Sequence, residues 1–152
     1  MTKKKDEQLA QMMADLQRVQ ADFENYRKRV EQEKIFARDS AQANTILKLL
    51  PTIDSIERAT RYMPPELADN PWAQGIARLE KSLEKSLEAL SVHRIDAKPG
   101  TIFNPELHEA IQLDEDAEGE HEVIAEELQA GYTLNGVPMR HAMVKVTRQN
   151  NA

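Results

Sequence analysis

Residues 9 to 30 carry an apolar stripe with heptad spacing, and this stripe constrains the fold more than any other feature of the chain. Its members are separated alternately by three and four positions: Leu9, Met12, Leu16, Val19, Phe23, Tyr26 and Val30. A stripe confined to two seam positions is typical of a helix that pairs with another helix, and such a polar helix is unstable until the seam is buried. We therefore predict a long N-terminal helix that forms a dimeric coiled coil. The alternative is a single helix that lies on its own domain.

The pattern changes twice further along the same predicted helix. Polar or small residues would occupy the next seam positions, which predicts a loosely paired middle segment: Glu33, Ala37 and Ser40. A broader apolar face follows and is suited to a helix bundle: Ile46, Leu47, Leu49, Leu50, Ile53 and Ile56. Pro51 lies inside this face. Because proline removes one helical hydrogen bond and clashes with the preceding turn, we expect a kink or restart close to Leu50.

A second helix is predicted after a break at residues 63–65 and a short linker at residues 66–70. Asn70 is a typical N-cap residue, and Pro71 suits the first helical position. One face of this helix is apolar: Ile76, Leu79, Leu83, Leu87 and Leu90. It would form a hairpin with the preceding helical segment, and two hairpins from two chains would close a four-helix bundle. The residues expected at that dimer interface, beside the heptad stripe, are Leu50, Ile53, Leu79, Leu83 and Leu87.

Short strand patterns replace the helical ones from about Arg94 onward. We expect strands at residues 110–113, 123–128, 132–134, 137–139 and 142–147, with a solvated acidic loop at residues 114–122. Asn135-Gly136 is the dipeptide that best suits a two-residue hairpin turn. The sequence therefore predicts an α+β fold. Residues 1–93 would form the helical dimerisation region, and residues 94–152 a small all-β domain.

The composition excludes several classes of function. The chain has no cysteine, and we interpret its four histidines as surface or loop residues without metal-site spacing. Residues 96–129 hold eleven acidic residues against Lys98 alone, which disfavours nucleic-acid binding. No apolar run approaches the length of a membrane span, and the basic N-terminus lacks the apolar stretch of a signal peptide. We expect a cytoplasmic protein that is not an enzyme and needs no cofactor.

Four blocks of sequence, in order, resemble the GrpE family, whose members are nucleotide exchange factors of the bacterial Hsp70 chaperone DnaK. The first two are residues 22–29 (DFENYRKR) and residues 49–59 (LLPTIDSIERA). The third is residues 103–111 (FNPELHEAI), and the fourth combines residues 131–136 (GYTLNG) with residues 139–146 (MRHAMVKV). The resemblance runs from about Leu16 to Arg148.

The resemblance implies a homodimer with paired long helices, a four-helix bundle and two β wings, each wing being the small β domain of one chain, residues 94–152. It implies that a wing and the helices bind the ATPase domain of a DnaK-type Hsp70 and open its nucleotide cleft to release ADP, within protein folding and the heat-shock response. The matching partner-binding positions on the wing are Leu128, Asn135, Gly136, Met139, Arg140 and Val146. Those on the helices are Arg27, Arg29, Glu57 and Arg58. The alternative function is a coiled-coil scaffold or passive holdase without exchange activity.

A structural role is the alternative interpretation at two wing positions, because Gly136 suits the turn and Val146 suits a core. The chain also departs from the family pattern twice. Val137 stands where family members commonly carry a basic residue after Asn-Gly, so one polar contact with the partner is expected to be missing. The acidic N-terminal tail common in the family is reduced to about six residues.

Overall fold

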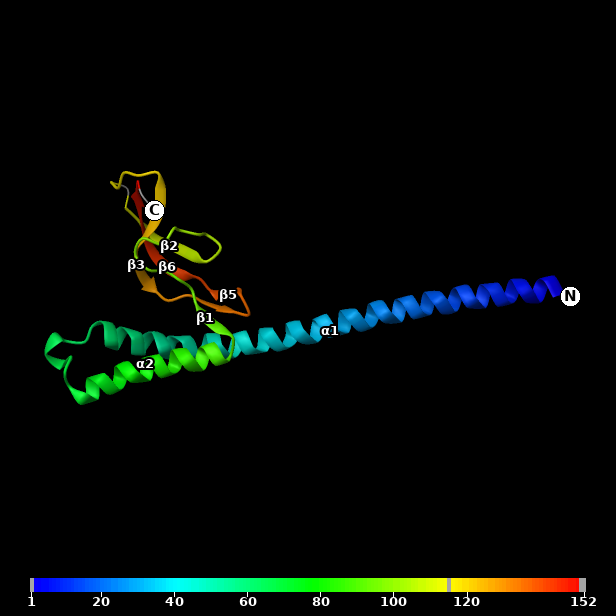
Figure 1. Cartoon of the computed structure of the whole chain (residues 1–152), viewed down its shortest axis with the longest axis horizontal. Coiled ribbons are helices and arrows are strands. Elements are labelled where there is room, and N and C mark those ends of the chain that lie inside the picture. Colours follow the sequence, from blue (N-terminus) through cyan, green and yellow to red (C-terminus); the bar gives the residue numbers. More distant parts are fainter. Residues whose placement is uncertain (1, 115, 151–152) are drawn as a thin grey trace. The chain divides into compact units, whose positions relative to one another are not determined.

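The structure is a computed structural model that describes residues 2–114 and 116–150. The long helix α1 (Thr2–Arg61) is followed by a 3-10 turn, η1 (Pro65–Leu67), and by helix α2 (Pro71–Ala89). The strands come after the helices along the chain (Figure 1). The predicted α+β class and the long N-terminal helix are therefore confirmed. The chain separates into two compact units, Met1–Gln42 and Ala43–Ala152.

The first unit consists of the N-terminal part of α1. Its heptad side chains are exposed: Leu16 is 67% and Phe23 is 61% exposed. Two further apolar residues of this unit, Ile35 and Phe36, are also exposed. The helix itself is as predicted, while its pairing with a second chain stays a prediction.

Helix α1 runs through Pro51 without interruption, so of the predicted kink or restart near Leu50 the restart is wrong, while the kink stays a prediction. A single proline removes one backbone donor, and the side chains around it hold the helix in place. Leu50 is fully buried and Ile53 is buried within the same unit. The Ser55 hydroxyl also donates to the Pro51 carbonyl at 2.8 Å. Packing of these apolar side chains therefore outweighs the local cost of the proline.

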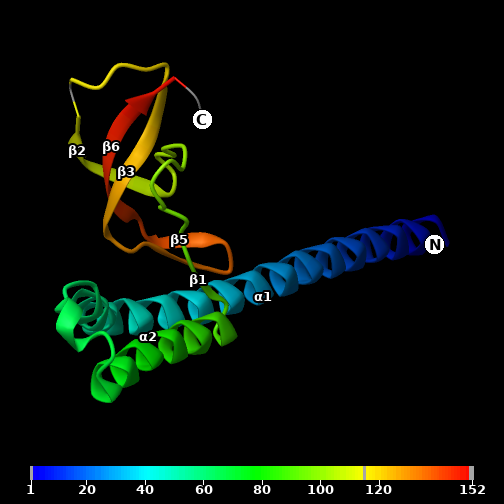
Figure 2. The ribbon, with the colours of Figure 1, turned by 60° about the vertical axis from the view of Figure 1, so that its left-hand side comes forward.

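Helix α2 begins as the sequence predicts. The Asn70 side chain accepts a hydrogen bond from the Trp72 backbone N–H at 2.9 Å, and Pro71 occupies the first helical position. The expected linker contains the turn η1 instead of being irregular throughout. Helix α2 packs beside the C-terminal part of α1, and both views show the two helices side by side (Figures 1 and 2). The predicted helical hairpin is therefore present within one chain.

The strands of the described residues form two three-stranded sheets. The first has the order β1 (Val92–Arg94), β4 (Tyr132–Leu134), β5 (Val137–Arg140), and all its pairs are antiparallel. The second has the order β2 (His108–Leu113), β6 (Ala142–Gln149), β3 (His121–Gln129), with β2 parallel and β3 antiparallel to β6 (Figure 2).

Five of these strands match predicted ones within three residues at each end, and β1 was not predicted. The predicted turn is confirmed, with φ of 50° at Asn135 and 81° at Gly136. The predicted acidic loop is partly strand, because β3 begins at His121, and its residue 115 lies outside the described residues.

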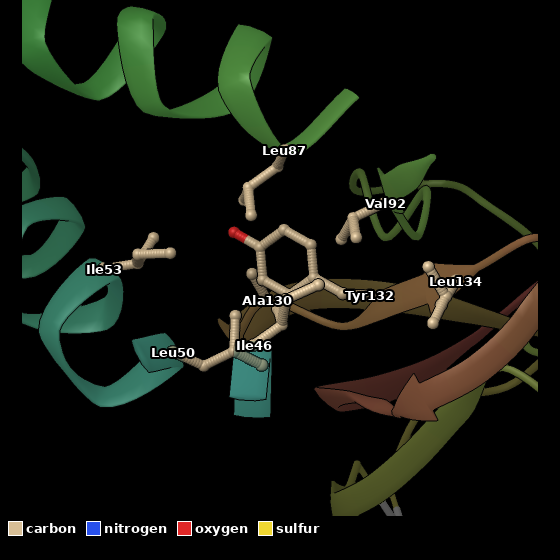
Figure 3. Packing of buried hydrophobic residues seen from close by; sticks show 8 residues of the cluster. All are labelled: Ile46, Leu50, Ile53, Leu87, Val92, Ala130, Tyr132 and Leu134. Carbon is tan, nitrogen blue, oxygen red and sulfur yellow. The ribbon is translucent and has the colours of Figure 1, made fainter. Parts of the chain in front are cut away.

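Two buried clusters hold the second unit together. One joins the helices to the first sheet, with Tyr132 at its centre (Figure 3); its members are Ile46, Leu50, Ile53, Leu87, Val92, Ala130, Tyr132 and Leu134. The other lies against the second sheet: Ile95, Ala97, Ile124, Ala142, Val144 and Val146. Because the first cluster draws on α1, α2, β1 and β4, the helical hairpin and the first sheet share one core.

Three residues expected at the dimer interface belong to this shared core. Leu50 is 0% exposed, and Ile53 and Leu87 are also buried by their own chain. Leu50 therefore has no surface to offer a second copy, and the expectation is corrected for this residue. For Ile53 and Leu87, which are 9% and 8% exposed, it stays a prediction. The apolar face of the hairpin contributes instead to the packing of the wing. Leu83 is partly exposed and Leu79 is exposed, so both remain available for an interface.

His108 is buried, which corrects its interpretation as a surface or loop residue. Its Nδ1 accepts a hydrogen bond from the Asn104 backbone N–H at 3.0 Å, and its Nε2 lies 2.8 Å from the Asp96 carbonyl oxygen. This pairing requires a neutral ring with the proton on Nε2. The side chain thus fixes the turn that precedes β2 to the chain segment that follows β1.

Candidate partner-binding surface

The surface to which the resemblance points lies in the second unit, where the last turns of α1 meet the β strands. Asp54, Glu57 and Arg61 are spaced by three and four residues, so they lie on one face of the helix. Each of them bonds to a residue of a strand or strand end. A row of polar contacts therefore runs alongside the shared apolar core.

The Asp54 carboxylate is the most enclosed acceptor of this row, with a side chain that is 10% exposed. It accepts two hydrogen bonds from the Arg140 guanidinium, at 2.7 and 2.8 Å. The Gln129 amide donates a third at 2.8 Å. Arg140 also donates from Nε to the Ala130 carbonyl at 3.0 Å. Bidentate pairing of this kind fixes direction as well as distance.

Glu57 and Arg94 form the next contact. The Glu57 carboxylate accepts hydrogen bonds from Arg94 at 2.8 Å and from the Tyr132 hydroxyl at 3.2 Å. Arg94 also pairs with Glu127 on β3. The Glu127 carbonyl in turn accepts a hydrogen bond from Arg61 at 3.1 Å. Two acidic and two basic side chains thus tie α1 to β1 and β3.

Burial shifts the pKa values of this cluster. Desolvation raises the pKa of Glu57 above its ordinary value, although Arg94 and the Tyr132 hydroxyl work in the opposite direction. Burial works to lower the pKa of Arg94, but its hydrogen bond to Glu127 and the charges of Glu127 and Glu57 outweigh it and raise that pKa. Burial and the Glu57 charge also raise the pKa of Tyr132, which keeps its phenol neutral.

Two of the resemblance-derived contact residues, Glu57 and Arg140, thus make their bonds inside the molecule. Two others, Arg58 and Leu128, line a small cavity of about 170 Å³ between α1 and β3. Arg58 is exposed and Leu128 is 40% exposed, so both are accessible to another protein. The structure thus brings these four positions from distant parts of the sequence together.

The hairpin between β4 and β5 holds three of the remaining positions. Asn135 and Gly136 are exposed at the turn, and both have the positive φ that the turn requires. Met139 is partly exposed and packs against the shared core. Val137, beside the turn, is among the most exposed apolar residues of the β strands. The tip therefore presents an apolar side chain.

Val146 is the position for which the partner-contact expectation is corrected. Its side chain is 1% exposed, because it packs with Ile124, Ala142 and Val144 in the second cluster. Successive side chains of β6 point alternately to the two faces of the sheet, and Val146 lies on the buried face. Val146 therefore supports the wing from within and has no side-chain surface for a partner.

Arg27 and Arg29 lie in the first unit, on the exposed helix. Arg29 is 3.7 Å from the Glu33 carboxylate one turn further on, and its guanidinium lies over the Tyr26 ring at 5.6 Å. Such exposed pairs contribute little to stability. Both arginines are therefore accessible, and nothing in their surroundings commits them to a structural role.

Six residues of the polar row were missed by reasoning from the sequence: Asp54, Arg61, Arg94, Glu127, Gln129 and Tyr132. Asp54 carried a signal, because it interrupts an apolar helical face directly after Ile53. A carboxylate at such a position requires a partner. Arg94 carried a weaker signal, because it is the last basic residue before the acidic stretch at residues 96–129. Neither signal identifies which residue lies opposite, since the partners are 33 to 86 positions away.

Two further cavities lie in the described part of the second unit. A cleft of about 780 Å³ with walls of mixed charge is lined by residues that include Arg61, Glu84, Arg94 and Glu126. An apolar cavity of about 390 Å³ lies between the ends of the two helices, lined by residues that include Ile56, Trp72 and Leu79. In the described residues no cluster of histidine and acidic side chains is arranged to hold a metal ion. None of the described helices combines the length and apolarity that a membrane span needs.

The architecture defines an α+β protein in which a heptad helix continues into a helical hairpin that shares its core with a small β region. The chain belongs to the GrpE family, because the family described as GrpE matches residues 1–148. That match includes all four sequence blocks and both units.

Individual relatives agree with the family assignment. The chain is 40% identical over 131 residues to protein GrpE of Lachnoclostridium phytofermentans, covering 86% of this chain and 58% of that relative. It is 39% identical over 134 residues to protein GrpE of Parasynechococcus marenigrum, covering 86% and 60%. For protein GrpE of Pelodictyon phaeoclathratiforme the identity is 36% over 146 residues, covering 93% and 70%. The chain thus spans about three fifths of the length of the first two relatives.

Proposed function

We propose that this protein is a nucleotide exchange factor and co-chaperone for a DnaK-type Hsp70, whose ATPase domain it binds and opens to release ADP. The observation that carries the proposal is the family match over residues 1–148, which includes the heptad helix and the wing together. A role in protein folding and the heat-shock response, and a cytoplasmic location, belong to the same proposal.

The mechanism follows from differential binding. If the exchange factor binds the open, nucleotide-free cleft more tightly than the closed one, it shifts the ATPase domain toward the open form. The two binding events are linked: if the exchange factor binds the nucleotide-free ATPase domain more tightly than the nucleotide-bound one by some factor, the affinity of the domain for nucleotide falls by the same factor when the exchange factor is bound. This requires a surface that keeps its shape on binding. The polar row at residues 54, 57 and 61 supports such a surface, because it ties the helix to the strands beside it.

Homodimerisation is part of the proposal. The exposed stripe of the first unit supports a coiled coil, because a helix with such a stripe is stable only against a partner. The exposed Leu79 and the apolar cavity beside Trp72 support a second contact between hairpins, as in a four-helix bundle. The residues proposed to contact the chaperone directly are Arg27, Arg29, Arg58, Leu128, Asn135, Gly136 and Met139.

Release of fluorescent ADP from a purified DnaK-type ATPase domain tests the proposal. We expect micromolar protein to accelerate release. Val137→Arg, which introduces the basic residue common in the family, should accelerate it further, while Val137→Gln should not. A protein that prevents aggregation of unfolded clients without accelerating release would be a passive holdase, and the exchange proposal would be rejected.

A further inference from the structure

The Asp54–Arg140 pair is largely enclosed, and its two side chains bond to each other and to neighbouring residues of the same chain. The Asp54 side chain is 10% and the Arg140 side chain 19% exposed. Arg140 donates to both Asp54 oxygens and to the Ala130 carbonyl. Its guanidinium also lies 5.7 Å from the centre of the Tyr132 ring. Little of its hydrogen-bonding capacity is left for a second protein.

The pair connects two parts of the wing to α1. Arg140 ends β5, so it belongs to the hairpin that carries Asn135, Gly136 and Val137. Ala130 follows β3, and Gln129, the last residue of β3, donates to the same carboxylate. Asp54 therefore lies at a junction where α1, the end of β3 and the end of the hairpin are held by one carboxylate.

Apolar packing alone does not define this junction. Hydrophobic burial is non-directional, whereas a bidentate Arg–carboxylate pair fixes both distance and orientation. Buried ion pairs are weak evidence for stability, and their best-supported role is to specify one arrangement. The Glu57–Arg94 contact lies one turn further along α1 and restrains the rotation of the strands about the first contact.

We propose that Asp54 is a positioning residue that works through Arg140: the pair sets the angle at which the β4–β5 hairpin projects from α1. Arg140 then acts inward and does not contact the partner. The effect of the pair on ADP release rests on the proposed exchange function. A wing whose angle is not fixed can adapt to both the open and the closed cleft of the ATPase domain. It therefore binds the two forms with more similar affinity, and the preference for the open form that drives exchange is lost.

The first part of the test measures the wing angle without any partner. The chain has no cysteine, so Lys81→Cys on α2 and Val137→Cys on β5 can carry two nitroxide labels without background. Dilution with excess unlabelled chain leaves one labelled chain per dimer. Pulsed electron paramagnetic resonance should give one narrow distance distribution. Asp54→Asn should broaden or shift it, and the exposed control Asp69→Asn should not. An unchanged distribution with Asp54→Asn would overturn the proposal.

The second part is a double-mutant cycle in ADP release with Asp54→Asn, Arg140→Gln and both together. Each single variant should lower the maximal release rate at saturating protein by roughly tenfold, within the range of coupling between sites. The double variant should be no slower than the slower single one. Losses that multiply to roughly a hundredfold would show that Arg140 contacts the partner by itself and would overturn the inference.

Thermal melting by circular dichroism separates a moved wing from an unfolded one. If Asp54→Asn does not fold, Arg140→Lys replaces it in the distance measurement, because it keeps the charge and removes the bidentate geometry. In the double-mutant cycle Asp54→Glu takes its place, since it keeps the charge and displaces the carboxylate. If the unmodified protein fails to accelerate ADP release, the exchange function is rejected. The distance measurement still decides whether the pair sets the wing angle.

Discussion

The two units of the chain use the same kinds of apolar residue in opposite ways. In the first unit the heptad side chains, such as Leu16 and Phe23, are mostly exposed. In the second unit Leu50, Ile53 and Tyr132 are buried by residues of their own chain. Apolar surface stabilises a fold only when it is removed from water. The second unit therefore holds its own core, and the first depends on what covers its stripe.

This difference has a consequence for how each unit responds to dilution. Stability that comes from association depends on protein concentration, whereas stability from an internal core does not. Loss of helical signal from residues 2–42 should therefore shift with concentration, and unfolding of the strands should not.

The largest effect is expected from Leu50→Ala. This substitution removes a fully buried side chain from the core shared by α1, α2, β1 and β4. The free energy of unfolding should fall by about 2–5 kcal/mol, from lost burial and the cavity left behind. The matched control Leu16→Ala deletes the same atoms from an exposed position and should change the unfolding of the strands very little. Chemical denaturation followed by circular dichroism measures both, and equal losses would contradict the contrast.

The second effect concerns association. Phe23→Asp places a charge in the proposed seam, where its burial without a partner costs several kcal/mol. Since each 1.4 kcal/mol is tenfold, the dissociation constant should rise by roughly a hundredfold or more. Gln17→Asp adds the same charge to the outer face of the helix and should leave association unchanged. Sedimentation of an undiminished Phe23→Asp dimer would move the main contacts to the helical hairpins.

The third effect contrasts two glycines within the second unit. A Cβ added at Gly131 would lie 2.3 Å from the Ala142 backbone nitrogen, so the adjoining strands would have to separate. Gly131→Ala should cost about 1–3 kcal/mol, as overpacking does. A Cβ at Gly75, inside α2, meets nothing within 4 Å. Gly75→Ala should stabilise the protein by up to about 1 kcal/mol, because alanine favours the helix. Thermal melting that moves the same way for both would contradict the geometry.

Features encoded by short stretches of sequence could be predicted. The Asn70 cap depends on neighbouring residues, and the Asn135-Gly136 turn depends on a single dipeptide. The stripe on α1 is a repeat within one helix. Local signals of this kind do not require knowledge of what lies opposite in space. They sufficed for the fold class, the two helices, the β4–β5 hairpin and five of the six described strands.

Features that depend on distant partners could not be predicted. Strand β1 is three residues long and exists because Val92, His93 and Arg94 pair with β4, some forty positions away. The continuity of α1 through Pro51 depends on side chains packed around Leu50, which override the local preference. His108 is buried because Asn104 and Asp96 satisfy both ring nitrogens. The inward direction of Arg140 likewise became visible only with Asp54 opposite it.

The smallest effect separates a buried charge from an exposed one through pH. Burial raises the pKa of Glu57 above 4.5 in the folded protein, although Arg94 and Tyr132 oppose it. A carboxyl group with a raised folded pKa binds its proton more tightly in the folded than in the unfolded state. Its contribution to stability is therefore fully present below pH 4.5, and it is lost as the pH rises through the folded pKa.

Glu57→Gln removes this titration and keeps an acceptor for the Tyr132 hydroxyl. The free energy of unfolding of the unmodified protein, minus that of Glu57→Gln, should therefore decrease as the pH rises from about 4 toward neutral. Glu33→Gln is the control in the first unit, because its pair with Arg29 is highly exposed and contributes little at any pH. Denaturant unfolding at several pH values measures both differences. A difference for Glu57→Gln that grows with pH would mean that attraction to Arg94 outweighs burial, so that the polar row stabilises the wing as well as orienting it.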